Sequence, residues 1–287
     1  MNFKRCDVTL SIVNWNTRDE LRECLRSVLS QTDVSIEVMV VDNASSDGSA
    51  EMVRSEFAGR VTLIASENNI GFGAGHNLAI RRSSGRYVFL LNPDGRMLEE
   101  RVLRKMVDFM DSKPNVGMLG PKITNPDGTL QYSARRFPTM FAGVFRHPAI
   151  GRIFPNNRFV REYMMLDRSH EEVSDVDWLS GAALMVRRET FEQIGLMDER
   201  FFMYCEDVDW CRRAHAGGWR VVYFPMTSVQ HRIGAASDKN PIAMIKQHHA
   251  SMLRYFLKYD ARGPKLLLLP LVMIALWIRS RSLINRC

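Results

Sequence analysis

Acidic side chains stand at two places in this sequence where a carboxylate could do chemistry. In "YVFLLNPDGRMLE", residues 87–99, five largely apolar residues run into Asn92-Pro93-Asp94-Gly95. A carboxylate at the end of a buried strand can ligate a hard divalent cation and leave coordination positions for the oxygens of a diphosphate. The tetrapeptide is also typical of a tight turn, and from local chemistry alone the turn is the better explanation.

The second acidic cluster is "YCEDVDWCRR", which contains Glu206, Asp207 and Asp209. Negative charge at the start of a helix is stabilised by the helix dipole, and this is a sufficient structural reason for such a cluster. Aromatic residues precede it, so a carboxylate here could instead lie in a partly desolvated pocket and accept a proton from an attacking hydroxyl. His231 follows in "SVQHRIGAAS". A lone histidine is more often structural, but a neutral imidazole could complete a metal site.

Two polar segments add candidate binding groups. In "VVDNASSDGS", Asp42 ends an apolar run and could accept hydrogen bonds from a ribose or a base, although a plain loop has the same composition. In "NNIGFGAGHN", residues 68–77, three glycines allow the backbone to approach a ligand closely, and Asn77 could donate to a phosphate or a sugar. The spacing matches neither the dinucleotide fingerprint nor a P-loop.

Alternating strands and helices would position these groups. Strand-like runs are expected at 8–13, 36–41, 61–65 and 87–91, and helical periodicity at 17–30, 49–57, 78–83 and 101–112. This alternation predicts an α/β fold with a parallel sheet whose strand carboxyl ends form a ligand crevice. Residues 133–163 lack a clean period, which is typical of a long functional loop or a cover. A strand at 182–186, helices at 189–194 and 208–216, and a strand ending near Pro225 are expected to follow.

Composition bounds the class of protein. The 287 residues are 46% hydrophobic and carry a formal charge of +7, so the chain is globular and suits an anionic partner: a phosphate-bearing ligand, a nucleic acid or an anionic membrane. Five scattered cysteines favour a reducing compartment, and no signal peptide is evident at the N-terminus. The thirteen uncharged residues 266–278, "LLLLPLVMIALWI", lie between basic flanks. They fit a monotopic membrane anchor or a packed C-terminal helix about equally well.

The order of these motifs, with "TLSIVNWNT" and "WLSGAALMVRR", resembles the family 2 glycosyltransferases over about residues 7–237. The similarity is greatest to the rhamnosyltransferases of bacterial O-antigen and cell-wall polysaccharide assembly, and "LNPD" with "MYCEDVD" is its most specific part. The resemblance implies a GT-A fold, an α/β fold with a mostly parallel central sheet flanked by helices. It implies a glycosyltransferase domain over 1–240, with a donor nucleotide half at about 1–112 and an acceptor half at 113–240. A helical, membrane-associating extension is expected over 241–287.

Residue roles follow from the same resemblance. Asp207 would be the catalytic base. Asp94 would match the last acid of the D-x-D motif and ligate Mg or Mn together with His231, whereas Asn92 stands where such enzymes have another acid. The residues expected at the nucleotide are Val13, Asn14, Trp15, Asp42, Gly71, Gly73, Asn77 and Asn92. Those expected at the acceptor are Arg135, Arg136, Trp178, Gly181 and Glu206.

The implied activity is inverting transfer of L-rhamnose from the nucleotide diphosphate sugar dTDP-β-L-rhamnose to a polyprenyl-diphosphate-linked saccharide. The protein is expected to be cytoplasmic, peripheral on the inner face of the cell membrane and without a nucleic-acid partner; a homodimer stays open. Three alternatives stay open as well. They are a transferase that uses a UDP sugar, a nucleotidyltransferase, which would carry a basic glycine-rich loop near the first strand, and a catalytically weak carbohydrate- or membrane-binding module on the same fold.

Overall fold

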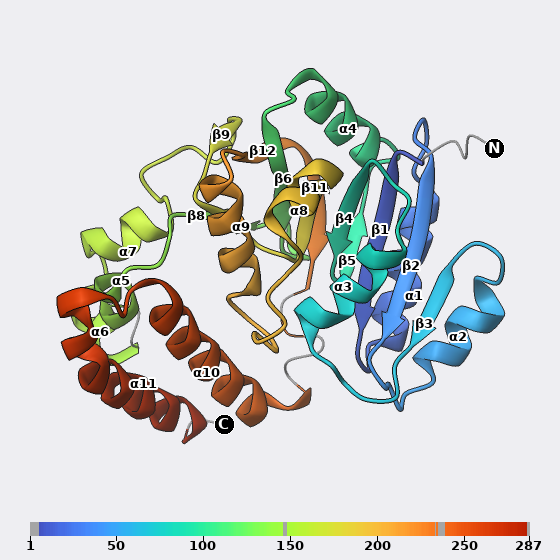
Figure 1. Ribbon diagram of the computed structural model, residues 1–287. Helices are drawn as coiled ribbons and strands as arrows, with labels where there is room; N and C mark the ends of the chain where they lie inside the picture. Colours follow the sequence, from blue (N-terminus) through green and yellow to red (C-terminus); the bar gives the residue numbers. More distant parts are fainter. Residues whose placement is uncertain (1–5, 146–147, 233, 235–238, 286–287) are drawn as a thin grey trace.

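A computed structural model describes residues 6–145, 148–232, 234 and 239–285 (Figure 1). Four parallel strands form the first half of its central sheet, in the order β3 (Thr62–Ala65), β2 (Ile36–Asp42), β1 (Val8–Asn14) and β4 (Tyr87–Leu91). All four coincide with the strands expected from the sequence, to within one residue. Because parallel strands present their carboxyl ends at one edge of a sheet, the polar residues that follow β1, β2 and β4 meet there.

The second half of the sheet is mixed. Beyond β4 lie β11 (Ala183–Arg187), β6 (Val116–Thr124), β12 (Arg220–His231) and β5 (Gly95–Met97). β11 is antiparallel to both of its neighbours, and β12 runs parallel to β6 but antiparallel to β5. The expected end of the last strand near Pro225 was wrong. The strand continues to His231 through a register shift between Phe224 and Ser228, and such an irregularity accommodates a proline that cannot donate to the ladder.

Helices cover both faces of the sheet, as expected (Figure 1). One layer consists of α1 (Arg18–Leu29), α2 (Ser49–Glu56) and α4 (Val102–Ser112), and the other of α3 (Phe72–Arg82), α8 (Arg188–Ile194) and α9 (Glu206–Ala216). Side chains alternate along β1: Leu10 and Ile12 join the core beneath the first layer, whereas Val13 packs in a separate cluster with Ala79 of α3. The architecture is the predicted α/β fold with a mostly parallel, helix-flanked sheet.

Glycines let α3 pack unusually close to its neighbours. The helix begins at Phe72 rather than near residue 78, so Gly73 and Gly75 lie inside it. A Cβ on Gly75 would lie 2.9 Å from the methyl carbons of Val13, and one on Gly71 would lie 2.3 Å from the carbonyl oxygen of Phe202. Glycine has a low helix propensity, so the sequence predicted a loop where the first turns of α3 lie. The close packing of this helix explains why glycines occur there.

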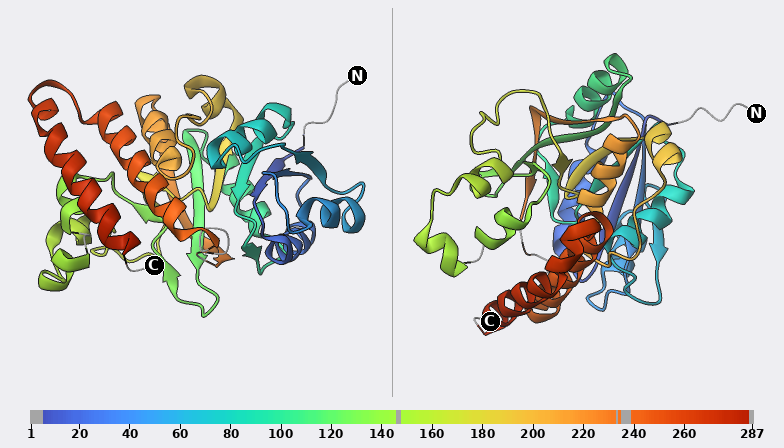
Figure 2. Two further views of the ribbon diagram at one scale, coloured as in Figure 1. Left: turned by 90° about the horizontal axis from the view of Figure 1, so that it is seen from below. Right: turned by 60° about the vertical axis from the view of Figure 1, so that its left-hand side comes forward.

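The segment expected as a long loop or cover contains short helices. They are α5 (Met140–Phe145), α6 (Pro148–Ile153) and α7 (Arg158–Tyr163). The chain ends in α10 (Pro241–Tyr259), a 3-10 turn (Gly263–Leu268) and α11 (Leu269–Ile284), and Figure 2 shows α10 and α11 side by side. The Tyr259 hydroxyl of α10 donates to Asp209 Oδ1 of α9 at 2.6 Å, so α10 is tied to the main body.

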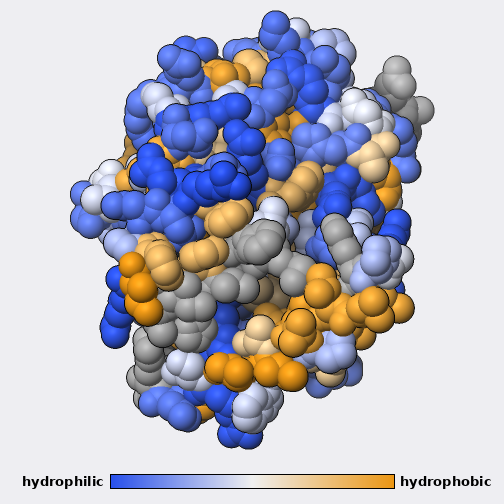
Figure 3. Space-filling model, turned by 90° about the vertical axis from the view of Figure 1, so that its left-hand side faces the viewer, coloured by the Kyte–Doolittle hydropathy of each residue, from blue (hydrophilic) through white to orange (hydrophobic). Residues whose placement is uncertain are grey.

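By contrast, α11 buries none of its residues. Within the described residues, one stretch, Leu266–Ile284, is sufficiently long and apolar to cross a membrane by length and composition. Leu267 is 82% exposed, Leu271 63% and Trp277 62%, and Ile153 and Phe154 at the end of α6 are exposed too. The space-filling view of this side of the molecule shows apolar side chains gathered on its lower part (Figure 3).

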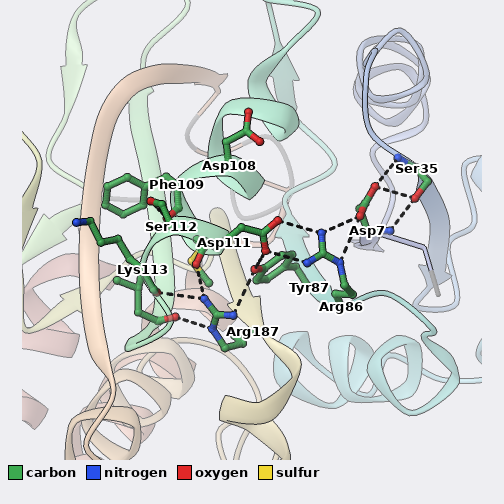
Figure 4. Close-up of polar contacts among 12 residues, drawn as sticks. Asp7, Ser35, Arg86, Tyr87, Asp108, Phe109, Asp111, Ser112, Lys113 and Arg187 are labelled. Carbon is green, nitrogen blue, oxygen red and sulfur yellow. Dashed lines mark hydrogen bonds and ion pairs between the residues drawn. The ribbon is translucent and has the colours of Figure 1, made fainter. Parts of the chain in front are cut away.

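A polar network ties the amino end of β4 to its surroundings (Figure 4). The Arg86 guanidinium bridges the carboxylates of Asp7 and Asp111, at 2.9 Å and 2.8 Å. The Tyr87 hydroxyl donates to Asp111 at 2.6 Å, and Arg187 of β11 donates to the Tyr87 hydroxyl oxygen at 3.3 Å. The network therefore fixes β1, β4, β11 and the end of α4 relative to one another, at the edge opposite the strand carboxyl ends.

Candidate active site

A cavity of about 270 Å³ lies beyond the carboxyl ends of β1 and β4. Nine residues expected at a site from the sequence line it, namely Val13, Trp15, Gly71, Asn92, Asp94, Gly181, Glu206, Asp207 and His231. These residues come from segments spread over more than two hundred positions, and the sheet topology brings them together. Asn43, Asn69 and Tyr204 line it as well and were missed, although Asn43 directly follows Asp42 in the same polar loop.

Asp94 enters the cavity from a tight turn. The Gly95 N–H donates to the carbonyl oxygen of Asn92 at 2.9 Å, which confirms the turn that the tetrapeptide predicts. A Cβ on Gly95 would lie 2.5 Å from Leu91 Cδ1, so a larger residue here would force the buried Leu91 side chain to move. The Asp94 side chain is 7% exposed, and its Oδ1 accepts no hydrogen bond from the residues that the structure describes.

Strand pairing brings His231 to this carboxylate. His231 is the register partner of Gly95 across the antiparallel pair of β12 and β5. Its Nε2 lies 3.3 Å from Asp94 Oδ1 and 3.0 Å from Asn92 Nδ2. The Asn92 amide oxygen likewise has no partner among the described residues. Asn92, Asp94 and His231 therefore converge at one point of the cavity wall, as expected for Asp94 and His231 from the sequence.

The residues at this point fit a divalent cation. Asp94 offers a buried carboxylate oxygen without a partner, and His231 offers a ring nitrogen. The two atoms lie 3.3 Å apart and line the same cavity, so both could hold one cation. No group of three or more His, Cys, Asp and Glu side chains suited to a metal occurs in the described ranges. Among the described side chains, Asp94 and His231 would leave positions on such a cation for the oxygens of a bound diphosphate.

The second acidic cluster enters the cavity from the first turn of α9. The two residues before it, Tyr204 and Cys205, both adopt left-handed backbone conformations, at φ 68° and 69°. Such conformations are costly for residues with side chains and persist where the surrounding structure enforces them. They turn the chain so that Glu206 and Asp207 start the helix at the cavity wall.

Backbone donors hold the Asp207 carboxylate. Gly181 N–H donates to Oδ2 at 3.0 Å, and Val208 N–H donates to Oδ1 at 2.8 Å. Burial raises the pKa of Asp207, and the two N–H groups and the charge of Arg135 oppose that rise without cancelling it. Asp207 is thus a positioned carboxylate with an increased affinity for a proton, which is what a general base needs.

Glu206 differs from its neighbour. It is 4% exposed, and its Oε2 has no partner in the described part of the chain. Burial, and then the charge of Asp207, raise the pKa of Glu206 well above its usual value. A carboxyl group that keeps its proton can donate a hydrogen bond into the cavity, whereas Asp207 can only accept once ionised.

Several residues expected at the nucleotide lie behind the cavity wall. Asn14 donates to Asp42 Oδ1 at 2.9 Å, and both side chains are buried. Asn77 is fully buried and exchanges hydrogen bonds with the backbone of Met197, at 2.9 Å and 3.1 Å. Gly73 packs against Met197 and Glu206. The structure thus brings Val13, Trp15, Gly71 and Asn92 to the cavity wall. Behind that wall, packing and hydrogen bonds hold the other four residues expected at the nucleotide, which are Asn14, Asp42, Gly73 and Asn77.

The residues expected at the acceptor divide in the same way. Gly181 and Glu206 line the cavity. Trp178 is 6% exposed and donates from its ring nitrogen to the carbonyl oxygen of Arg136 at 2.8 Å. It is not among the residues that line the cavity. The Arg135 guanidinium lies over the Trp178 ring at 5.1 Å from its centroid. Arg136 is exposed.

Comparisons with known proteins agree with this geometry. The model of glycosyl transferase family 2 matches residues 9–195. An N-acetylglucosaminyl-diphospho-decaprenol L-rhamnosyltransferase of Mycobacterium tuberculosis is 31% identical over 83% of this chain and 80% of its own length. Rhamnosyltransferase WbbL of Escherichia coli K12 is 26% identical over 78% of this chain and 83% of its own.

Solved structures share the fold at low sequence identity. A mannosyltransferase of Pyrobaculum calidifontis, in complex with GDP-Man and Mn²⁺, has a TM-score of 0.61 at 18% identity and covers 96% of this chain and 74% of its own. GalNAc-T7 with UDP, GalNAc and Mn²⁺ has a TM-score of 0.60 at 14% identity, covering 87% and 48%. The fold is the GT-A fold that the sequence predicted, and enzymes of this fold bind a divalent cation in these complexes.

Proposed function

This chain belongs to glycosyl transferase family 2, and from that premise we propose that it transfers L-rhamnose from dTDP-β-L-rhamnose to a polyprenyl-diphosphate-linked saccharide. That the protein is a glycosyltransferase of glycan biosynthesis follows from the family and its relatives. The donor sugar and the lipid-linked acceptor are the proposed part. Their support is the name of the mycobacterial relative, which joins an L-rhamnosyl group to an N-acetylglucosaminyl-diphospho-decaprenol.

One observation carries the proposal: a candidate cation site and a candidate base line the same cavity. Asp94 and His231 stand on one part of its wall and Asp207 on another. Sugar transfer from a nucleotide needs both functions at once, a place for the diphosphate and a group that takes the acceptor's proton.

Asp207 is proposed as the base of a single inverting displacement. Its carboxylate takes the proton of an acceptor hydroxyl as that oxygen attacks the anomeric carbon of the sugar. The bond from this carbon to the diphosphate oxygen breaks, and the nucleoside diphosphate leaves with the electron pair. Glu206 would orient the acceptor by donating its retained proton, consistent with the raised pKa of its carboxyl group.

Asp94 and His231 are proposed as the protein ligands of Mg²⁺ or Mn²⁺. A cation held by them would supply positive charge for the leaving diphosphate. Asn92, which lines the cavity beside His231, is proposed to contact the diphosphate by donating from its amide N–H. Val13, Trp15, Asn43 and Gly71 are proposed to bind the nucleoside. A donor half over residues 1–112 and an acceptor half over 113–240 are proposed with this assignment, and His231 would join the donor site from the second half.

The extension from residue 241 is proposed to contact the inner face of the cell membrane. Its support is the exposed apolar side chains of residues 266–278, with Arg262 before this segment and Arg281 after it. Apolar residues with basic flanks bind anionic bilayers at the interface, and a polyprenyl acceptor resides in such a bilayer. The contact would keep the cavity near its lipid-linked substrate.

The test is a donor screen with a lipid-diphosphate-linked N-acetylglucosamine acceptor. The purified protein is incubated with dTDP-β-L-rhamnose, UDP-glucose, UDP-galactose or GDP-mannose, and glycolipid product and free nucleotide are measured. Product only or mainly with dTDP-rhamnose supports the proposal, whereas faster transfer from a UDP sugar overturns the rhamnosyl assignment and leaves the transferase assignment intact. Repeating the screen with EDTA and then added Mn²⁺ tests the cation.

A further inference from the structure

One amide side chain contacts both the imidazole ring and the backbone carbonyl of His231. Gln131 on β7 (Leu130–Gln131) lies with its Oε1 2.9 Å from Nδ1 of the ring. Its Nε2 donates to the backbone carbonyl oxygen of the same histidine at 2.6 Å. A carbonyl oxygen can only accept, so the amide nitrogen must face it. The amide oxygen therefore faces the ring, and Nδ1 must carry a hydrogen to donate to it.

A chain of hydrogen bonds fixes the same orientation from the other side. Gln131 Nε2 also donates to Asn125 Oδ1 at 2.7 Å, and Asn125 Nδ2 donates to Thr129 Oγ1 at 2.8 Å. The Thr129 hydroxyl in turn donates to the Asp127 carboxylate at 2.6 Å. An ionised carboxylate only accepts, and the hydrogen bonds from the side chain and backbone of Thr129 lower the pKa of Asp127. Every donor in this relay thus points outward, from His231 to Asp127.

We infer that Gln131 is a positioning residue that holds His231 in the tautomer with hydrogen on Nδ1 and so keeps the Nε2 lone pair available to a cation beside Asp94. This inference rests on the proposed metal role of Asp94 and His231. The Asn92 side-chain nitrogen lies 3.0 Å from Nε2, so its N–H can donate to this lone pair, and a cation that binds Nε2 would displace that hydrogen bond.

The opposite tautomer would close the site. A hydrogen on Nε2 would point to Asp94 Oδ1, 3.3 Å away, and the two side chains would satisfy each other. With hydrogen on Nδ1, two acceptor atoms face one another, and their repulsion is relieved when a cation binds both. Partners that orient a histidine ligand in this way typically change metal affinity by about 10- to 100-fold when removed. Gln131 is therefore expected to act on metal binding without touching the metal.

The test compares two substitutions of matched size. Gln131→Met keeps the length of the side chain but removes the acceptor for Nδ1–H, whereas Gln131→Glu keeps an acceptor. Ring ¹⁵N shifts of metal-free, ¹⁵N-histidine-labelled protein at pH 8 report the tautomer, and the loss of signals in His231→Gln identifies those of His231. Hydrogen on Nδ1 is expected in the wild type and in Gln131→Glu, and a shift toward hydrogen on Nε2 in Gln131→Met.

Mn²⁺ titration monitored by electron paramagnetic resonance gives a second readout. Gln131→Met is expected to raise the Mn²⁺ dissociation constant about 10- to 100-fold, and Gln131→Glu by clearly less. The inference is overturned if the wild-type ring carries hydrogen on Nε2 or on both nitrogens at pH 8, or if Gln131→Met leaves the tautomer unchanged. If the wild type shows the expected tautomer but binds no Mn²⁺, the cation part of the proposed function fails while the tautomer assignment stands.

Discussion

The backbone N–H of Gly181 donates a hydrogen bond of 3.0 Å to Oδ2 of Asp207, from the loop before β11 to the first turn of α9. The loop is packed closely here, because a Cβ on Gly181 would lie 3.1 Å from the ring of Phe72. A main-chain donor cannot change rotamer, so the position of the carboxylate is set by the packing of α9 against β10 (Trp178–Leu179) and the loop that follows it.

Asp207→Asn is expected to lower kcat by about 10²- to 10⁴-fold, since general-base catalysis typically contributes that much. Asparagine keeps the shape of the side chain, so the dissociation constant for the nucleotide sugar should change little. The rate of product formation measures the loss of kcat, and calorimetry measures the dissociation constant for the nucleotide sugar. Asp108→Asn, an exposed carboxylate on α4 that does not line the cavity, is the matched control. Transfer near the wild-type rate in Asp207→Asn would remove Asp207 as the base.

The pH dependence of kcat/KM should show an acidic limb above pH 3.8. Asp207 must be ionised to take a proton, and burial raises its pKa from the usual value of 3.8. Activity is therefore expected to rise as the pH increases through this raised pKa, and the limb should be missing from the residual activity of Asp207→Asn. A limb that persists unchanged in the variant would assign it to another group.

Glu206→Gln is expected to stabilise the protein at neutral and higher pH. The folded-state pKa of Glu206 is raised above its unfolded value of 4.5, so folding is favoured most below pH 4.5. That contribution declines by about 1.4 kcal/mol per pH unit between the unfolded and folded pKa values. Glutamine cannot ionise and shows no such decline. Urea unfolding at pH 4 and pH 8 measures the difference in unfolding free energy between Glu206→Gln and the wild type. The same difference at both pH values would contradict the raised pKa.

Tyr87→Phe is expected to cost about 1–2 kcal/mol of stability, because its hydroxyl donates to the Asp111 carboxylate and the ring is buried. The network lowers the pKa of Asp111, so this contribution is present above the unfolded pKa and lost as pH falls through the folded one. Tyr223→Phe removes a longer bond, 3.2 Å, to an uncharged carbonyl and is the control. Chemical denaturation at pH 7 and pH 3 compares them. A larger loss in Tyr223→Phe would refute the ranking.

Leu271→Ser combined with Trp277→Ser is expected to weaken binding to anionic vesicles at least about tenfold, since each buried large apolar side chain contributes roughly 1.5–3 kcal/mol. Both residues are more than half exposed on α11, so the fold should be unaffected. Leu98→Ser, at a position 65% exposed outside α11, is the matched control. Vesicle flotation with and without added salt measures binding, and unchanged flotation of the double variant would exclude this surface as the contact.

Sequence patterns predicted those parts of the fold that depend on local chemistry. Alternation of apolar runs and helical periodicity located β1, β2, β3 and β4 and predicted a mostly parallel sheet. Two predicted element boundaries were wrong because they depend on residues distant in the sequence. α3 starts early because its glycines pack against Val13 and Phe202, and β12 passes Pro225 because it pairs with β6 and β5 on either side of a register shift.

The tetrapeptide Asn-Pro-Asp-Gly shows the division between sequence and tertiary structure. It occurs at 92–95 and at 125–128, and both copies form a turn closed by a 2.9 Å hydrogen bond from the glycine N–H to the asparagine carbonyl. Turn formation depends on neighbouring residues, so the sequence alone determined it. The environment of the carboxylate, by contrast, depends on the tertiary structure. Asp94 follows a buried strand and lies beside His231 because β12 pairs with β5. Asp127 is exposed and accepts hydrogen bonds from Thr129. Long-range strand pairing made the first copy a candidate cation ligand and the second the outer end of the relay that orients His231.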